Sequence, residues 1–209
     1  CVGNMLGEAV TGMRSSLTLL GALLGKCGHA VMEHPGGCTI GARPIDLHIE
    51  ALKKMNVEFV EGERELRART SGLEGADIEL SCASVGATEN IVLAAVLARG
   101  TTHIRGAARE PEVMALCEYL KACGARILGE GTTELTIEGV SSLRGTEFVV
   151  PSDRIVAGTY LFGCLAAGGE VFLKDAPAEH LWAAILTAEQ MGAVCQSTKD
   201  GLYVQAPER

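Results

Sequence analysis

The sequence from Pro35 to Leu47 reads PGGCTIGARPIDL and contains three glycines, one cysteine and one arginine. Glycine adopts backbone conformations that other residues resist, which suits a mobile or tightly turned loop. Pro44 suits the first turn of a helix. Apolar residues at helical spacing follow it, at Ile45, Ile49 and Leu52. The stretch therefore predicts a loop that presents Cys38 and leads through Arg43 into a helix.

A similar segment occurs three times along the chain. The three copies are CTIGARPIDLHIE (Cys38–Glu50), THIRGAAREPEVM (Thr102–Met114) and VFLKDAPAEHLW (Val171–Trp182), and their prolines lie 67 and 66 residues apart. Each proline is followed by an acid, which is favourable in the first turn of a helix because of the helix dipole. These acids are Asp46, Glu112 and Glu179. The spacing predicts an internal repeat.

Each repeat has a second apolar helix before the proline segment and two short strands after it. The expected leading helices are Ser15–Cys27, Val85–Arg99 and Ile155–Ala167. The clearest strands are expected at Asp77–Leu80, Ala125–Leu128 and Glu134–Ile137. We therefore predict an α/β fold of repeated βαβαββ units. The period is longer than that of common solenoid repeats, which makes a solenoid the less favoured alternative.

A domain boundary is expected where the third copy opens. The sequence Pro151-Ser152-Asp153-Arg154 follows a strand-like run at Glu147–Val150 and precedes the third apolar helix. We assign residues 1–151 to a first domain with two repeat units and residues 152–209 to a second domain.

Composition narrows the class of protein. The chain has 209 residues and a hydrophobic content of 47%, enough for a sizeable core, and its longest apolar run is too short to span a bilayer. The net charge of −8, without a basic run, argues against nucleic acid as the partner. An anionic small molecule could still bind where arginines and helix N-termini gather. We expect no nucleic acid and no membrane partner.

The eight cysteines form no Cys-x-x-Cys pair, so neither a zinc site nor a disulfide framework is predicted. Four of them lie in or beside apolar stretches, where a thiol is usually a small buried hydrophobe: Cys117, Cys123, Cys164 and Cys195. Reduced cysteines are typical of the cytoplasm, where we expect this protein.

Cys38 differs because a glycine-rich polar segment presents it. Arg43 and the helix that starts near Pro44 could lower its pKa, which would make the thiol a nucleophile or a general acid. The alternative is a loop cysteine without a role. Arg14, Ser84 and Arg154 stand at equivalent helix starts, and together they predict an electropositive pocket, with simple capping as the alternative for Ser84. His48 is more typical of packing or surface than of catalysis.

Three segments together resemble the UDP-N-acetylglucosamine 1-carboxyvinyltransferases of the enolpyruvyl transferase family. They are PGGCTIGARPIDLH (Pro35–His48), SVGATEN (Ser84–Asn90) and AAREPE (Ala107–Glu112), within a likeness that runs from about Met13 to near the end. The resemblance implies six βαβαββ units in two inside-out α/β barrels. About three units fit in this chain: two from the domain of the cysteine loop and the first of the other domain. The partner is then the other half of its own full-length chain.

The resemblance also implies a reaction without metal or organic cofactor. Enolpyruvyl passes from phosphoenolpyruvate to the 3-hydroxyl of UDP-N-acetylglucosamine, the first committed step of peptidoglycan synthesis and hence of cell-wall growth and division. Several essential residues of the family lie outside this chain, so we expect an incomplete and inactive portion. The alternatives are a non-catalytic paralogue that binds nucleotide sugars and an interaction scaffold. The shikimate-pathway enzyme shares the fold but lacks the cysteine loop.

Residue by residue, the resemblance makes Cys38 the acid that protonates C3 of phosphoenolpyruvate and the thiol that fosfomycin alkylates. Arg14 and Arg43 match arginines that contact substrate phosphate or carboxylate. Two segments match those that line the sugar-nucleotide site in the family: Arg43, Pro44, Ile45, Asp46 and Leu47, and Ser84, Val85 and Gly86. The chain departs from the family at Cys82-Ala83, which stands where many members carry a lysine. It departs again at Ser152, beside the proposed substrate-binding Arg154.

Overall fold

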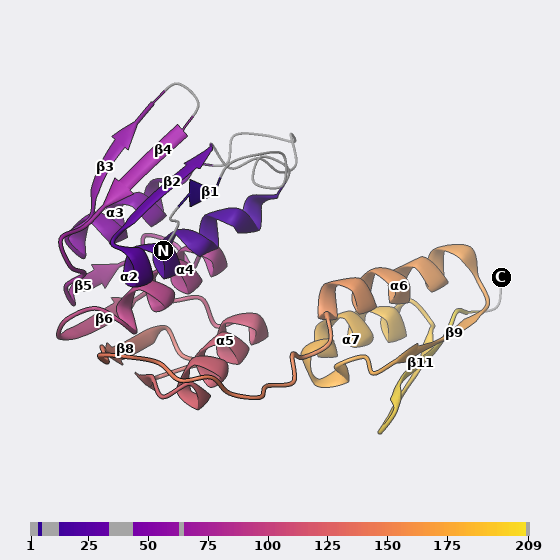
Figure 1. The fold of residues 1–209 in the computed structure, drawn as a ribbon. Helices are drawn as coiled ribbons and strands as arrows, with labels where there is room; N and C mark the ends of the chain where they lie inside the picture. The colour runs from indigo at the N-terminus through magenta and orange to yellow at the C-terminus, as the bar shows by residue number, and fades with distance from the viewer. Residues whose placement is uncertain (1–3, 6–12, 34–43, 63–64, 208–209) are drawn as a thin grey trace. The chain divides into compact units, whose positions relative to one another are not determined.

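The structure is a computed structural model that describes residues 4–5, 13–33, 44–62 and 65–207. The chain forms two compact units, Cys1–Phe148 (unit 1) and Val149–Arg209 (unit 2). The ribbon in Figure 1 shows the helices and strands of both units.

Unit 1 begins with one repeat copy built around a four-stranded sheet of order β1-β2-β4-β3. Strand β1 runs parallel to β2, whereas β4 is antiparallel to both β2 and β3. The elements of this copy are β1 (Asn4–Met5), the 3-10 helix η1 (Arg14–Thr18), α2 (Leu19–Cys27), β2 (His29–Glu33), α3 (Asp46–Lys54), β3 (Glu58–Glu61) and β4 (Glu65–Arg69).

A second copy in unit 1 has the same topology. Its sheet order is β5-β6-β8-β7, with β5 parallel to β6 and β8 antiparallel to both β6 and β7. The elements are β5 (Asp77–Glu79), α4 (Val85–Ala95), β6 (Thr101–Arg105), α5 (Pro111–Ala122), β7 (Arg126–Leu128) and β8 (Glu134–Glu138). The matching strand orders confirm the predicted βαβαββ repeat.

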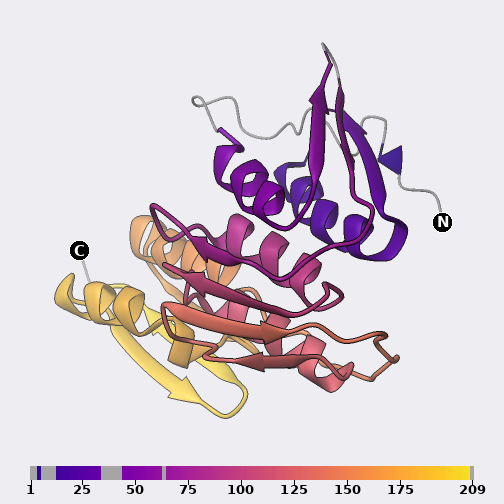
Figure 2. The same cartoon turned by 90° about the vertical axis from the view of Figure 1, so that its left-hand side faces the viewer.

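Helix α4 lies at the centre of unit 1, in contact with η1, α2, α3 and α5 (Figures 1 and 2). Seven of its eleven residues are buried, including the polar Thr88 and Asn90, and the other four are half-buried. The strands alternate between buried and exposed positions, so each sheet turns one face to the helices. The largest fully buried side chains are Leu17, Leu20, Leu24, Met32, Leu52, Met55, Leu66, Ile78, Ile91, Ile104, Leu135 and Ile137.

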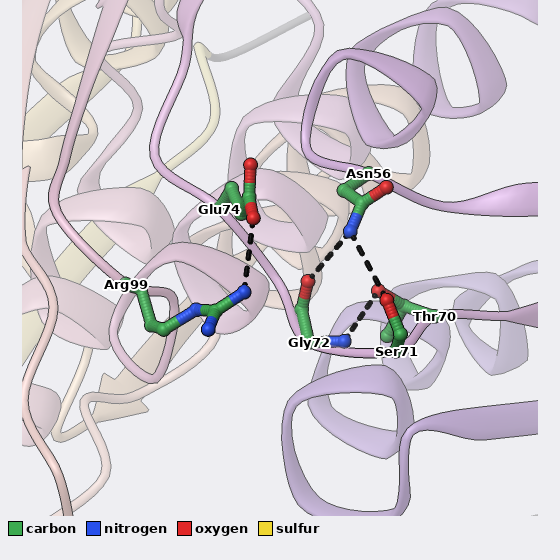
Figure 3. A network of polar contacts seen from close by, with 6 residues as sticks. All are labelled: Asn56, Thr70, Ser71, Gly72, Glu74 and Arg99. Atoms are coloured by element: carbon green, nitrogen blue, oxygen red, sulfur yellow. Dashed lines mark hydrogen bonds and ion pairs between the residues drawn. The ribbon is translucent and has the colours of Figure 1, made fainter.

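The link between the two copies is held by polar contacts (Figure 3). Asn56 closes α3 in a left-handed conformation, φ 68°, and its amide donates to the Gly72 carbonyl at 3.1 Å. Arg99, which follows α4, pairs with Glu74 at 2.9 Å. The Arg99 backbone N–H donates to the Leu73 carbonyl at 2.8 Å. The linker between the two copies is thus bound to residues that follow α3 and α4. These contacts fix one copy against the other.

Unit 2 holds the third copy, with a sheet of order β10-β11-β9 that is antiparallel throughout. Its elements are α6 (Arg154–Ala167), β9 (Glu170–Lys174), η2 (Ala178–His180), α7 (Trp182–Gln190), β10 (Val194–Thr198) and β11 (Gly201–Gln205). Its core is small. Large apolar side chains stay exposed on it at Ile155, Val156, Tyr160, Phe162, Phe172, Trp182, Leu186, Met191 and Val194.

Three local predictions were wrong. The helix expected from Pro44 begins at Asp46, and the helix expected from Pro177 begins at Trp182, after the short 3-10 turn η2. Proline fits a cap or turn as well as a first helical turn, so it marks a helix start only approximately. The run Glu147–Val150 is irregular, because no neighbouring strand pairs with it in the described part of the chain.

Candidate active site

The two residues predicted to be catalytic, Cys38 and Arg43, lie outside the described residues, which resume at Pro44. Arg43 was also predicted to bind substrate; the other substrate-binding predictions in unit 1 are described: Arg14, Pro44, Ile45, Asp46, Leu47, Ser84, Val85 and Gly86. Arg154 belongs to unit 2.

Arg14 is held against the start of α3. It is the first residue of η1, and its Nη2 donates a hydrogen bond to the Pro44 carbonyl at 3.0 Å, across 30 residues of sequence. Asp46, in the first turn of α3, adds a carboxylate near the positive end of that helix. A guanidinium and a helix N-terminus therefore lie at the point where the chain leaves the segment that contains Cys38.

Ser84 is the N-cap of α4. Its Oγ accepts a hydrogen bond from the Ala87 backbone N–H at 3.3 Å, so the hydroxyl caps the helix, which is the alternative role predicted for Ser84. The first backbone N–H groups of a helix have no partner within the helix and can bind an anion. Capping and ligand binding are thus compatible at this segment.

His48 joins the start of α3 to the start of α4. The residue is 7% exposed, and a Cβ placed on Gly86 would lie 3.4 Å from its Cε1. Its Nδ1 lies 3.0 Å from Nδ2 of Asn90 on α4. Asn90 also bonds to the Leu17 carbonyl at 3.1 Å and to the Gly21 N–H at 2.6 Å. These contacts bring η1, α2, α3 and α4 together.

We call this set of residues the helix-start cluster. It comprises Arg14, Pro44, Asp46, His48, Ser84, Val85, Gly86 and Asn90. Burial and the nearby Arg14 lower the pKa of His48 from 6.5 to about 4, although Asp46 opposes the change. The histidine is therefore neutral at physiological pH, and the cationic group of the described cluster is Arg14.

The starts of α4 and α5 are also joined. The Thr88 Oγ1, fully buried, accepts from the Ala108 N–H at 3.0 Å. Glu89, half-buried beside it, has a raised pKa because of burial and, second, because of the negative charge of Glu112. These carboxylates make this side of the α4 start less favourable for an anion than the side that faces Arg14.

Arg154 is the first residue of α6, where Asp153 caps the helix by accepting from the Ile155 and Val156 N–H groups at 2.7 and 3.0 Å. Because it lies in unit 2, the expected pocket formed by Arg14, Ser84 and Arg154 together stays a prediction.

Of the cysteines expected in apolar surroundings, Cys117, Cys123 and Cys164 are buried free thiols and Cys195 is a half-buried one. Within the described ranges, no three His, Cys, Asp or Glu side chains are arranged to hold a metal ion. No helix there has the length and apolar character needed to cross a membrane.

Asn90 was not predicted to belong to the site, and His48 was expected only to pack or to lie at the surface. Asn90 lies 42 residues from His48 and 69 from Gly21, so spacing along the chain could not reveal their contact. One signal was available: a polar asparagine within an apolar helix is buried only with hydrogen-bond partners.

Solved structures with similar folds include enolpyruvyl transferases. An EPSP synthase from Acinetobacter baumannii superposes with a TM-score of 0.65 at 24% identity, over 92% of this chain and 46% of its own. The enolpyruvyl transferase NikO from Streptomyces tendae gives a TM-score of 0.75 at 20% identity, over 92% of this chain and 47% of its own. The chain thus spans about half the length of these proteins and shares their mixed α/β fold.

The family comparison covers almost the whole chain. Residues 3–209 match the family described as EPSP synthase (3-phosphoshikimate 1-carboxyvinyltransferase). This match extends over both units and all three repeat copies, with the fold in agreement. The chain therefore belongs to the EPSP synthase family of enolpyruvyl transferases.

Proposed function

We propose that this chain is the part of a UDP-N-acetylglucosamine 1-carboxyvinyltransferase that carries the acid thiol, Cys38, and one wall of the sugar-nucleotide site. The reaction transfers enolpyruvyl from phosphoenolpyruvate to the 3-hydroxyl of the sugar, with release of phosphate, and serves peptidoglycan synthesis in the cytoplasm. The chain spans about half of its solved relatives, so we expect it to bind ligands without measurable turnover of its own.

One observation carries the proposal. The sequence PGGCTIGAR leads directly into Pro44, whose carbonyl accepts the hydrogen bond from Arg14. The thiol-bearing segment is therefore joined covalently to the most cationic point of the helix-start cluster. An acidic protein of net charge −8 needs such a local concentration of positive potential to bind phosphorylated substrates.

The chemistry requires a proton donor and a site that accepts moving negative charge. The Cys38 thiol would deliver a proton to C3 of phosphoenolpyruvate while the sugar 3-hydroxyl oxygen forms a bond to the adjacent carbon and gives its proton to a base in the other half of the full-length protein. That carbon would then lose phosphate while C3 loses a proton, which restores the double bond. Arg14 and Arg43 would stabilise the phosphate and carboxylate charges, and the first-turn amides of α4 would bind further oxygens.

A second candidate is the activity after which the family is named, with 3-phosphoshikimate as the acceptor. The solved EPSP synthase relative supports it at the level of the fold. The sequence of the loop favours the sugar nucleotide, because a thiol between glycines is the feature by which the two branches differ.

The test is the mass of the intact chain after treatment with fosfomycin, alone and with either acceptor. We expect one adduct in the unchanged chain and in Cys82→Ser, which removes an exposed thiol outside the loop. We expect none in Cys38→Ser. UDP-N-acetylglucosamine should accelerate the reaction, and 3-phosphoshikimate should not.

Acceleration by 3-phosphoshikimate alone would favour the second candidate. An unmodified Cys38 in the presence of the bound sugar nucleotide would indicate a non-catalytic binding protein. Phosphate release by the purified chain, with both substrates, would refute the expectation that it has no turnover.

A further inference from the structure

The orientation of the Asn90 side chain is fixed by two backbone groups of another part of unit 1. Its Oδ1 accepts from the Gly21 N–H at 2.6 Å, and its Nδ2 donates to the Leu17 carbonyl at 3.1 Å. A backbone N–H can only donate and a carbonyl can only accept, so the amide cannot be exchanged end for end.

This orientation determines the protonation of His48. The second hydrogen of Asn90 Nδ2 faces His48 Nδ1 at 3.0 Å, so Nδ1 must be the acceptor. A neutral imidazole that accepts at Nδ1 carries its proton on Nε2. Asn90 therefore selects one tautomer of His48, and a proton on Nδ1 would bring two donors together.

The Nε2–H edge of the ring faces the start of α4. A Cβ on Gly86 would lie 3.4 Å from Cε1 and 3.7 Å from Nε2. No acceptor of the described residues is hydrogen-bonded to Nε2. The one fully buried side-chain polar atom without a partner in the described part is Thr102 Oγ1, so Nε2 keeps contact with solvent. A donor with a fixed direction is thus available beside Gly86.

The surrounding charges keep this donor neutral. Arg14 on η1 disfavours a second proton on the ring, and Asp46 on α3 favours one less strongly. From α4, the residues against the ring are Gly86 and Asn90, neither of which titrates. A neutral donor suits an uncharged oxygen, because it supplies direction without charge, whereas Arg14 supplies the charge for phosphate.

We propose that His48 is a further ligand-binding residue of the helix-start cluster, with its Nε2–H donating to a carbonyl or hydroxyl oxygen of the nucleotide sugar. The proposal rests on the proposed function, since it assumes that a nucleotide sugar binds at this cluster. Asn90 acts behind it as a positioning residue that fixes the tautomer.

The first experiment observes the ring directly. Nitrogen-15 NMR of the unchanged chain should show His48 protonated on Nε2 and unprotonated on Nδ1 near neutral pH. UDP-N-acetylglucosamine should shift the Nε2 resonance much more than the Nδ1 resonance, which a merely structural histidine would not show. Uridine monophosphate and N-acetylglucosamine 1-phosphate, added separately, identify which half of the ligand supplies the acceptor.

The second experiment uses variants and calorimetry with UDP-N-acetylglucosamine. His48→Phe keeps a flat ring without a donor and should weaken binding about tenfold, as for one lost hydrogen bond. His48→Gln can accept from Asn90 and donate outward, so it should bind within about threefold of the unchanged chain. His103→Phe, which alters a histidine of β6 that bonds to Thr136, should bind like the unchanged chain.

The outcomes separate the two proposals. If the unchanged chain does not bind the sugar nucleotide, the assignment of the ligand is overturned and the donor role of His48 falls with it. If it binds and His48→Phe binds equally, or if the NMR spectrum shows the proton on Nδ1, the donor role alone is overturned. The NMR result is decisive even where His48→Phe does not fold.

Discussion

Acid should destabilise unit 1 through His48 in particular. Burial and the charge of Arg14 lower the pKa of this histidine in the folded chain to about 4, against 6.5 for the free side chain. Between these two values the unfolded chain binds a proton that the folded chain does not. The free energy of unfolding therefore falls as the pH falls through this window and is unaffected by His48 above it.

The size of the effect follows from the two pKa values. Each pH unit between 6.5 and about 4 costs 1.4 kcal/mol, so protonation of this residue removes about 3 kcal/mol from unit 1 between pH 7 and pH 4. A small domain has only about 5–15 kcal/mol of stability in total. Glu89 acts in the opposite direction, because its raised pKa makes the folded chain bind the extra proton in acid.

The assay compares the unchanged chain with His48→Gln, which keeps the partner of Asn90 but does not titrate. Denaturant unfolding at a series of pH values should show the unchanged chain losing about 3 kcal/mol more than His48→Gln between pH 7 and pH 4. Fluorescence of Trp182 reports unit 2, so the probe should be hydrogen exchange of the α4 peptide, Val85–Ala95. Parallel stability curves for the two proteins would refute the reasoning.

Three further changes test other parts of the structure. Gly21→Ala places a methyl carbon 2.1 Å from a backbone oxygen of α4 and should cost unit 1 about 1–3 kcal/mol, whereas Gly25→Ala, 3.5 Å from its nearest neighbour, should cost nothing. Denaturant midpoints measure both, and equal midpoints would contradict the close helix contact. Cys82, exposed, should react with iodoacetamide faster than Cys117, since burial raises the pKa of that thiol to about 11. Peptide mass spectrometry gives the two rates, and the reverse order would be inconsistent with the burial. Asp153→Ala removes the cap of α6 and should cost unit 2 about 1 kcal/mol, seen as a lower midpoint of tryptophan fluorescence; an unchanged midpoint would show that the cap contributes nothing.

The ends of helices carry a clearer signal in the sequence than their beginnings do. Asn56, Gly124 and Gly192 have positive φ values of 68°, 102° and 93°, as expected of residues that close a helix. Proline was less informative: Pro111 starts α5, but Pro44 and Pro177 precede their helices. The restricted φ of proline fits several local structures, and tertiary packing decides among them.

The repeat was predictable because it is written in the spacing of similar segments. The packing of the helices was not predictable, because they meet through residues far apart in sequence. Gly21 lies against Asn90 closely enough that a Cβ would overlap the Asn90 carbonyl oxygen, and neither residue suggests the other from its position. The candidate site was predictable only where local segments resembled a known family; the hydrogen bond from Arg14 to Pro44 required coordinates.

The packing of unit 1 and the chemistry of the candidate site depend on the same side chain. Asn90 is fully buried on α4, so its side chain must satisfy its hydrogen bonds within the protein. Two of these hydrogen bonds join Asn90 to α2 and η1. The remaining hydrogen of its Nδ2 can then only be donated to His48. The protonation of the histidine is therefore a consequence of helix packing. Any substitution of Asn90 that keeps the fold should still release the tautomer, and a shift of the His48 proton to Nδ1 in such a variant would demonstrate this dependence.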